Sequence, residues 1–254
     1  MSPAQLYESI LQKQSLLCVA LDPSEVAFSA ETPLSPERAE HRLYEVIEKT
    51  TPYAVAYKLN TAFYERWGEK GWELLRRVRE ALPSDCLCIA DAKRGDIAHT
   101  NRYYAQAFYE ELKFDALTVH VYMGWEALSP FLEYRDKWVF GLLRTTEAAP
   151  WQTSIWRRVI EEAPLNTAAT IGWVWGAHYG PELWELRQIR PNDWLLIPGF
   201  GAQGGELAKE TPAFPALITV GRTLLQQPEA AAEWAARSAC FLPTSEATGR
   251  FELP

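Results

Sequence analysis

Eight short apolar runs, nearly all separated by segments of helical character, constrain the fold of this chain more than any other feature. The runs cover residues 16–21, 54–58, 87–90, 116–119, 138–143, 170–175, 194–197 and 216–220. Continuous apolar runs of this length are typical of parallel strands buried on both faces. Strands that alternate with helices imply right-handed crossovers, and eight of them predict a closed (β/α)8 TIM barrel. A doubly wound open sheet is the alternative, but no Gly-x-Gly-x-x-Gly follows the first run.

Helix signals lie between these runs. Ser35 is a predicted N-cap, because Pro36 then occupies the first helical position. Asp96 is a second predicted N-cap, since it precedes apolar residues at helical spacing. The predicted helices cover about 3–14, 36–50, 61–82, 97–112, 124–134 and 154–162, a segment from about 181, and 228–239.

Composition limits the classes of function. The chain has 254 residues and a formal net charge of −8, so we expect no nucleic-acid partner. It contains no run of eighteen apolar residues and no basic-then-apolar leader, and we predict a cytoplasmic protein without a membrane partner. The four cysteines include no Cys-x-x-Cys pair, which fits that compartment. We predict one domain over 1–254, with a surface tail at 241–254.

A cluster of charges follows the third run, in Asp91-Ala-Lys-Arg-Gly-Asp-Ile97. Because side chains alternate along a strand, Asp91 and Lys93 should point the same way. These charges could be only a helix cap and a solvated ion pair. However, parallel α/β proteins build their sites at the carboxyl ends of strands. A neighbouring carboxylate also stabilises the ammonium form of Lys93, which makes it a candidate proton donor.

Other polar residues also follow the predicted strands. All strand ends of a barrel share one face, so their side chains should converge unless they are scattered surface charges. The pooled set is Asp22, Lys58, Asn60, Asp91, Lys93, Asp96, Thr146, Gln203 and Arg222. His120 and His178 follow strands too, but their spacing matches no metal motif, and we predict no metal ion.

The segments after the last two runs predict an anion site. A glycine-rich segment, 198–205, follows the seventh run, and Gly221-Arg222 follow the eighth. Glycines let backbone amides approach an anion closely, and an arginine offers two parallel donors. Phosphate sites in such barrels commonly follow strands seven and eight. A phosphorylated small molecule is the expected ligand.

The stretch 91–97 resembles the signature of the orotidine 5'-phosphate decarboxylase family, in the form found in one bacterial branch. The resemblance runs from Asp22 to Arg222 and includes segments 122–125 and 198–205 in the family's order. It implies a charged catalytic array, with Lys93 as the proton donor. That array is Lys58, Asp91, Lys93 and Asp96. The substrate contacts that we assign are Asp22, Asn60, Ile97, Thr100, Thr146, Pro198, Gln203, Gly221 and Arg222.

The resemblance further implies loss of CO₂ from orotidine 5'-monophosphate to give UMP, the last step of de novo pyrimidine synthesis, without a cofactor. It implies a homodimer in which Asp96, Ile97 and Thr100 enter the partner's site. Two features depart from the family pattern. A Thr145-Thr146 pair followed by Glu147 stands where relatives have Thr-Ser, and His99 has no assigned role.

Two other functions remain open from the sequence. Related barrels use a similar Asp-x-Lys-x-x-Asp motif for Mg²⁺-dependent decarboxylation or aldol chemistry of sugar phosphates. The chain could also be a catalytically silent phosphate-binding barrel, although it retains Lys58, Asp91, Lys93 and Asp96 together. A metal requirement would favour the first, and tight UMP binding without turnover would favour the second.

Overall fold

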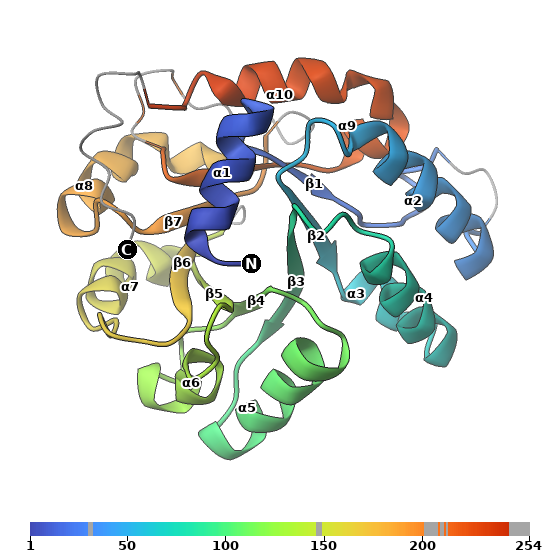
Figure 1. Cartoon of the computed structure of the whole chain (residues 1–254). Coiled ribbons are helices and arrows are strands. Elements are labelled where there is room, and N and C mark those ends of the chain that lie inside the picture. Colours follow the sequence, from blue (N-terminus) through green and yellow to red (C-terminus); the bar gives the residue numbers. More distant parts are fainter. Residues whose placement is uncertain (30–32, 146–148, 201–207, 209–210, 212, 244–254) are drawn as a thin grey trace.

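A closed parallel barrel forms the centre of the molecule. The structure, a computed structural model, describes residues 1–29, 33–145, 149–200, 208, 211 and 213–243. In this part of the chain eight strands pair in chain order (Figure 1). They are β1 (Leu17–Ala20), β2 (Ala56–Asn60), β3 (Leu87–Arg94), β4 (Ala116–Val119), β5 (Trp138–Arg144), β6 (Thr170–Trp175), β7 (Trp194–Ile197) and β8 (Ala216–Val220). The predicted TIM barrel is confirmed, and β4, β6, β7 and β8 have the predicted bounds.

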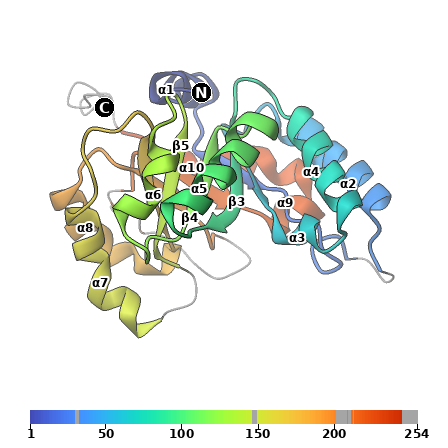
Figure 2. The same cartoon turned by 90° about the horizontal axis from the view of Figure 1, so that it is seen from below.

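Helices surround this barrel, and one closes an end of it. The α-helices are α1 (Pro3–Lys13), α2 (Pro36–Thr50), α3 (Ala62–Glu65), α4 (Glu69–Glu80), α5 (Ala98–Ala105), α6 (Trp125–Leu132), α7 (Pro150–Glu161), α8 (Leu183–Ile189), α9 (Arg222–Gln226) and α10 (Ala231–Ala239). Figure 2 shows α1 at one end of the barrel. The indole of Trp138, the first residue of β5, donates to the Met1 carbonyl there. The N-terminal ends of the strands are thus covered, which leaves the C-terminal ends for a site.

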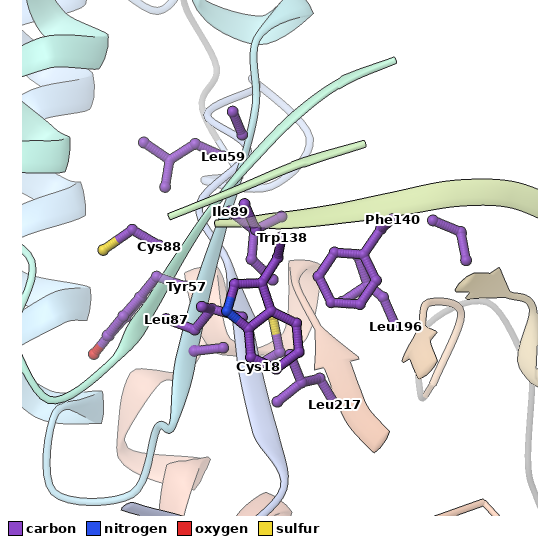
Figure 3. Packing of buried hydrophobic residues seen from close by; sticks show 14 of the residues in the cluster. Cys18, Tyr57, Leu59, Leu87, Cys88, Ile89, Trp138, Phe140, Leu196 and Leu217 are labelled. Atoms are coloured by element: carbon purple, nitrogen blue, oxygen red, sulfur yellow. The ribbon is translucent and has the colours of Figure 1, made fainter. Parts of the chain in front are cut away.

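Large apolar side chains fill the barrel. Trp138 stacks on Phe140 with ring centroids 6.0 Å apart and meets Trp194 edge-on at 5.4 Å. Figure 3 shows Trp138 and Phe140 among the other buried side chains of the core. Cys86 and Cys88 are buried and free, which confirms that they pack and do not bridge. This core fixes the strands whose far ends carry the polar residues.

The predicted helix over 61–82 is wrong, because the chain breaks at Gly68. Gly68 has φ +59°, a left-handed conformation that interrupts the helix between α3 and α4. Gly71 then packs so closely on α3 that a Cβ atom there would lie 1.8 Å from the Tyr64 carbonyl oxygen. The buried Tyr64 hydroxyl donates to the Leu21 carbonyl at 2.7 Å. The short helix α3 therefore holds the residue that follows β1, directly before Asp22.

The predicted N-cap at Asp96 is also wrong, whereas the one at Ser35 is confirmed by its bond from the Arg38 amide. Ile97 is the residue that precedes α5, and it makes no side-chain cap. Two hydrogen bonds from the Asn101 side chain hold this turn instead. Its amide oxygen accepts the Asp96 N–H at 3.0 Å, and its nitrogen donates to the Asp96 carbonyl at 2.7 Å. The Asp96 carboxylate is therefore not needed to start the helix.

Three other helix starts differ from the prediction. The helix α7 begins at Pro150 and not at Ser154, because proline suits the first helical position. Short 3₁₀ turns, Ala177–Glu182 and Pro228–Ala230, precede α8 and α10. A π-helical turn, Gln106–Glu111, follows α5. Most of the predicted tail, residues 244–254, lies outside the described residues, and Phe241 is buried against Phe200.

Replacement of Gly71 tests the packing of α3 on α4. We expect Gly71→Ala to lower the free energy of unfolding by about 1–3 kcal/mol, the usual cost of extra atoms in a packed interior. Urea unfolding followed by circular dichroism measures this. Lys70→Ala, at the exposed neighbouring position, is the control and should change little. Equal unfolding midpoints for Gly71→Ala and wild type would contradict the close approach.

Candidate active site

A cavity of about 330 Å³ lies at the C-terminal ends of the strands. It collects eight of the residues predicted from the sequence, although they come from five different strands or the segments that follow them. These are Asp22, Lys58, Asn60, Asp91, Lys93, Pro198, Gly221 and Arg222. The convergence of strand-end residues is thus as expected for a barrel. Their roles remain predictions.

The end of β3 bulges out of the sheet where its charges lie. Ala90 pairs with Leu117 and Arg94 with Val119, so three residues of β3 face one residue of β4. Within the bulge, Lys93 has φ +49°, the left-handed region that a lysine rarely adopts. Its ammonium nitrogen lies 2.6 Å from Oδ1 of Asp91. The two side chains do meet as predicted, but through an irregular strand and not through plain alternation.

Four charges of alternating sign run across β1, β2 and β3. The Lys58 Nζ lies 2.8 Å from Asp91 Oδ2 and 3.5 Å from Asp22 Oδ2. The other oxygen of Asp22 accepts the Asn60 amide N–H at 3.0 Å. With the Lys93–Asp91 contact, the order is Asp22, Lys58, Asp91, Lys93. Each inner member is held between two opposite charges.

This order decides the ionisation of the buried members. Burial of Asp91 would raise its pKa, but the charges of Lys58 and Lys93 outweigh burial and hold that pKa well below the usual range. Burial would likewise lower the pKa of Lys58, yet Asp22 and Asp91 raise it above its ordinary value. Both groups are therefore charged at neutral pH.

The wall opposite these charges is apolar. Leu142 of β5, Val174 of β6 and Leu196 of β7 line it, and Pro198 and Phe200 continue it beyond β7. A cavity that is charged on one side and apolar on the other suits a flat ring with a charged substituent. The site thus offers different surroundings to the two sides of such a ligand.

A separate group of residues forms the end of the cavity near β8. Gly221 and Arg222 lie at the start of α9, and Ser24 and Thr223 line the same cavity. Gln226 of α9 donates to the Val26 carbonyl, which ties α9 to the segment after β1. The guanidinium of Arg222 is the cation that this end supplies among the described residues lining the cavity. This end suits the anionic group predicted from the sequence.

Some predicted residues are not in the cavity. Asp96, Ile97 and Thr100 do not line it, and the Ile97 side chain is 55% exposed. The Oδ1 atom of Asp96 accepts the Ile97 amide N–H at 2.7 Å. Thr146 and Gln203 lie outside the described residues, so their predicted contacts stay predictions.

Several residues of the site were not predicted from the sequence, and Thr118 and Thr145 are two of them. Thr118 of β4 is fully buried and donates to Asp91 Oδ1 at 3.0 Å. A single polar residue within the apolar run 116–119 was the available signal. Thr145 lines the cavity, and its hydroxyl and amide both bond to the buried Gln152 of α7, at 2.8 and 3.2 Å. No local pattern connects residues 145 and 152.

Comparison with known proteins gives the family. A model of the orotidine 5'-phosphate decarboxylase / HUMPS family matches residues 15–236. The chain belongs to this family. It is 41% identical to orotidine 5'-phosphate decarboxylase of Dehalococcoides mccartyi over 209 residues, 77% of this chain and 76% of that protein. It is 37% identical to the enzyme of that name from Thermomicrobium roseum, over 97% of this chain and 91% of the relative.

A solved structure supports the same family assignment. Leishmania donovani UMP synthase superposes with a TM-score of 0.82 and 35% identity, over 93% of this chain. The chain spans about half of that longer protein, 55% of its length. The resemblance stated from the sequence is therefore confirmed at the level of the family. In the described part of the chain, no helix is both long and apolar enough to cross a membrane.

The stability of an Asp91 variant should depend on pH. We expect Asp91→Asn to cost about 3 kcal/mol of unfolding free energy at pH 7, because it leaves the buried Lys58 without the nearer of its two carboxylate partners. Folding lowers the pKa of Asp91, so its contribution is complete above the unfolded-state value of about 3.9 and decreases as pH falls below it. The difference between variant and wild type should therefore shrink in acid.

Urea unfolding at a series of pH values from 7 to 3 measures this difference. Glu162→Gln is the control, since the ion pair of Glu162 with Arg158 is exposed. A difference for Asp91→Asn that stays constant over the series would contradict the assigned ionisation.

Proposed function

We propose that this chain removes CO₂ from orotidine 5'-monophosphate to give UMP, with Lys93 as the proton donor. The observation that carries the proposal is the alternating order Asp22, Lys58, Asp91, Lys93 inside a cavity with an apolar wall. Relatives that share 37–41% of their residues with this chain bear the name of that decarboxylase. The proposed unit is the single domain 1–254.

The proposed reaction requires these residues to stabilise a carbanion and then to protonate it. The bond between C6 and the carboxylate breaks, CO₂ leaves, and the electron pair stays on C6 of the pyrimidine ring. The Lys93 ammonium stabilises this carbanion and then transfers its proton to C6, after which solvent reprotonates the amine. A fixed cation next to a fixed carboxylate needs little rearrangement during the reaction. That is the main source of rate enhancement in sites of this kind.

Asp91 has two effects in this proposal. It positions the Lys93 ammonium, 2.6 Å away, and it remains ionised because of Lys58 and Lys93. The substrate carboxylate then lies near a like charge, and loss of CO₂ removes that repulsion. Lys58 of the neighbouring strand β2 supports Asp91, and Asp22, after β1, is proposed to contact a ribose hydroxyl.

The phosphate would occupy the other end of the cavity. Arg222 offers a planar pair of donors, and Gly221 begins the helix that follows β8. Gln203 and Thr146 are proposed to contact the phosphate and the pyrimidine. Binding energy from the distant phosphate can order the site around the ring, which is how remote groups raise the rate of a chemical step.

A homodimer would complete the site. Ile97, Tyr122 and Met123 follow β3 or β4 within a few residues, and Tyr103 lies in α5. The side chains of these four residues are between 46% and 82% exposed. Large apolar side chains exposed together are typical of an interface. Asp96, beside Ile97, is partly exposed and does not line the cavity of its own chain. We propose that a second copy covers this surface and receives Asp96, Ile97 and Thr100 in its site.

The magnesium-dependent alternative has less support from the charges. Both carboxylate oxygens of Asp91 accept from ammonium groups, at 2.8 Å from Lys58 and 2.6 Å from Lys93. A carboxylate in that state is a poor ligand for a cation, and we propose a reaction that needs no added metal.

We also propose that the reaction takes place in the cytosol. The described cysteines, Cys18, Cys86, Cys88 and Cys240, are all free, in keeping with a reducing compartment.

Lys93→Ala tests the proposed proton donor. We expect wild type to consume orotidine 5'-monophosphate in excess EDTA, with UMP as product, and Lys93→Ala to lose at least about 10⁴-fold in kcat, since it removes both the stabilising charge and the proton. An ultraviolet assay that follows the orotate absorbance measures the turnover of wild type and of the variant. Lys49→Ala, an exposed lysine on α2, is the control.

The outcomes of this assay separate the alternatives. Near-normal turnover by Lys93→Ala would exclude its proposed role. An inactive wild type that is restored by Mg²⁺ on a sugar phosphate would favour the metal-dependent chemistry. Tight UMP binding without turnover by wild type would favour a silent barrel.

Mixing two inactive variants tests the shared site. Lys93→Ala and Asp96→Asn should each be inactive alone, because each removes a group from every site. In a heterodimer, one site carries both substitutions and the other carries neither. After subunit exchange, the mixture should recover up to about a quarter of wild-type activity, as random pairing of two-fold dimers requires. Absence of recovery in a mixture shown to contain heterodimers would contradict the proposal.

A further inference from the structure

Thr118 is the single residue of β4 that lies opposite the bulge of β3. Between the pairs Ala90–Leu117 and Arg94–Val119, β3 has three residues and β4 has one. A bulge leaves backbone groups without their usual partner in the neighbouring strand. The Lys93 amide N–H is such a group, and it donates to the Thr118 hydroxyl at 3.0 Å. A side chain thus supplies the bond that the backbone of β4 cannot.

The same hydroxyl also donates its hydrogen to Asp91. The distance from Thr118 Oγ1 to Asp91 Oδ1 is 3.0 Å, and Oδ1 is the oxygen that also accepts the Lys93 ammonium. A hydroxyl has one hydrogen to donate. The Thr118 hydroxyl accepts from the Lys93 N–H, so its own hydrogen points to Asp91. The side chain of Thr118 is fully buried, so water does not compete for either bond.

The backbone at Lys93 needs such support. A lysine at φ +49° is in a region that costs about 1–3 kcal/mol relative to ordinary conformations. Residues in that state persist only when their surroundings hold them there. On the outer side of the barrel, the Arg94 guanidinium donates to the Ala92 carbonyl at 2.7 Å and to Glu65 at 2.6 Å. On the inner side, the bond that holds Lys93 comes from Thr118.

We infer that Thr118 is a positioning residue for the proton donor. It fixes the backbone of Lys93 and the carboxylate of Asp91 through one oxygen atom, and so sets where the Lys93 ammonium lies. It is placed to act on these two residues and not on the substrate, since Thr118 does not line the cavity. This inference rests on the proposed role of Lys93 in decarboxylation.

Replacement of the hydroxyl tests the inference. Thr118→Val keeps the shape of the side chain but leaves the Lys93 N–H unpaired. We expect kcat for orotidine 5'-monophosphate to fall about 10- to 100-fold, the rate equivalent of one hydrogen bond to a charged group. KM should change by less than about threefold, because the residues that hold the phosphate are untouched. Thr118→Ser, which retains the hydroxyl, should recover most of kcat.

Thr50→Val is the matched control. The Thr50 hydroxyl is also fully buried, and it bonds the Tyr57 hydroxyl at 2.8 Å between α2 and β2, away from the cavity. This variant should lose stability in urea unfolding but keep the wild-type kcat. The comparison separates loss of a buried hydrogen bond in general from loss of the one at Lys93.

The results also separate this inference from the proposed function. An inactive wild type would overturn the proposed function. An active wild type with an equally active, folded Thr118→Val would overturn only the role of Thr118. A kcat for Thr118→Ser as low as that for Thr118→Val would overturn it too, because the hydroxyl would not be the group that matters.

Discussion

The arrangement at the end of the barrel depends on one carboxylate, that of Asp91. It is buried between two ammonium groups, and each of its oxygens accepts from one of them. A buried ion is unfavourable unless its partners are close and well oriented. The condition is met because Lys58 of β2 lies 2.8 Å from Asp91 of β3 and 3.5 Å from Asp22, which follows β1. Removal of an inner charge, Lys58 or Asp91, would leave the outer charge beside it without its partner in this order.

The barrel was predictable because the signals that specify its strands and helices each lie within a short stretch of the sequence. Apolar runs of strand length, separated by helical segments, identify β4, β6, β7 and β8 to the residue. The predictions failed where the backbone departs from regular structure. The break at Gly68 depends on contact between α3 and α4, and the start of α5 depends on Asn101, which lies five residues after Asp96. Neither contact is visible in a periodic pattern.

The candidate site was predictable in its charges but not in its supports. Asp91 and Lys93 stand out as polar residues at the end of an apolar run, and their neighbours follow from the shared face of a barrel. Thr118 and Gln152 act across strands or from a helix, and their importance comes only from what the fold brings near them. The left-handed backbone of Lys93 likewise has no sequence signal, since lysine does not favour it.

The alternating order of Asp22, Lys58, Asp91 and Lys93 has a consequence for how a ligand arrives. Two carboxylates and two ammonium groups sum to zero charge, and the whole chain carries a formal charge of −8. Such a site does not draw a phosphorylated, carboxylated ligand from a distance by its overall field. In the proposed function, capture relies on short-range contacts, with Arg222 of the cavity as the main attraction. The four charges of this order can then act on the reacting bond in that proposal. They do not hold an anionic product too tightly, because their sum exerts no net attraction on an anion.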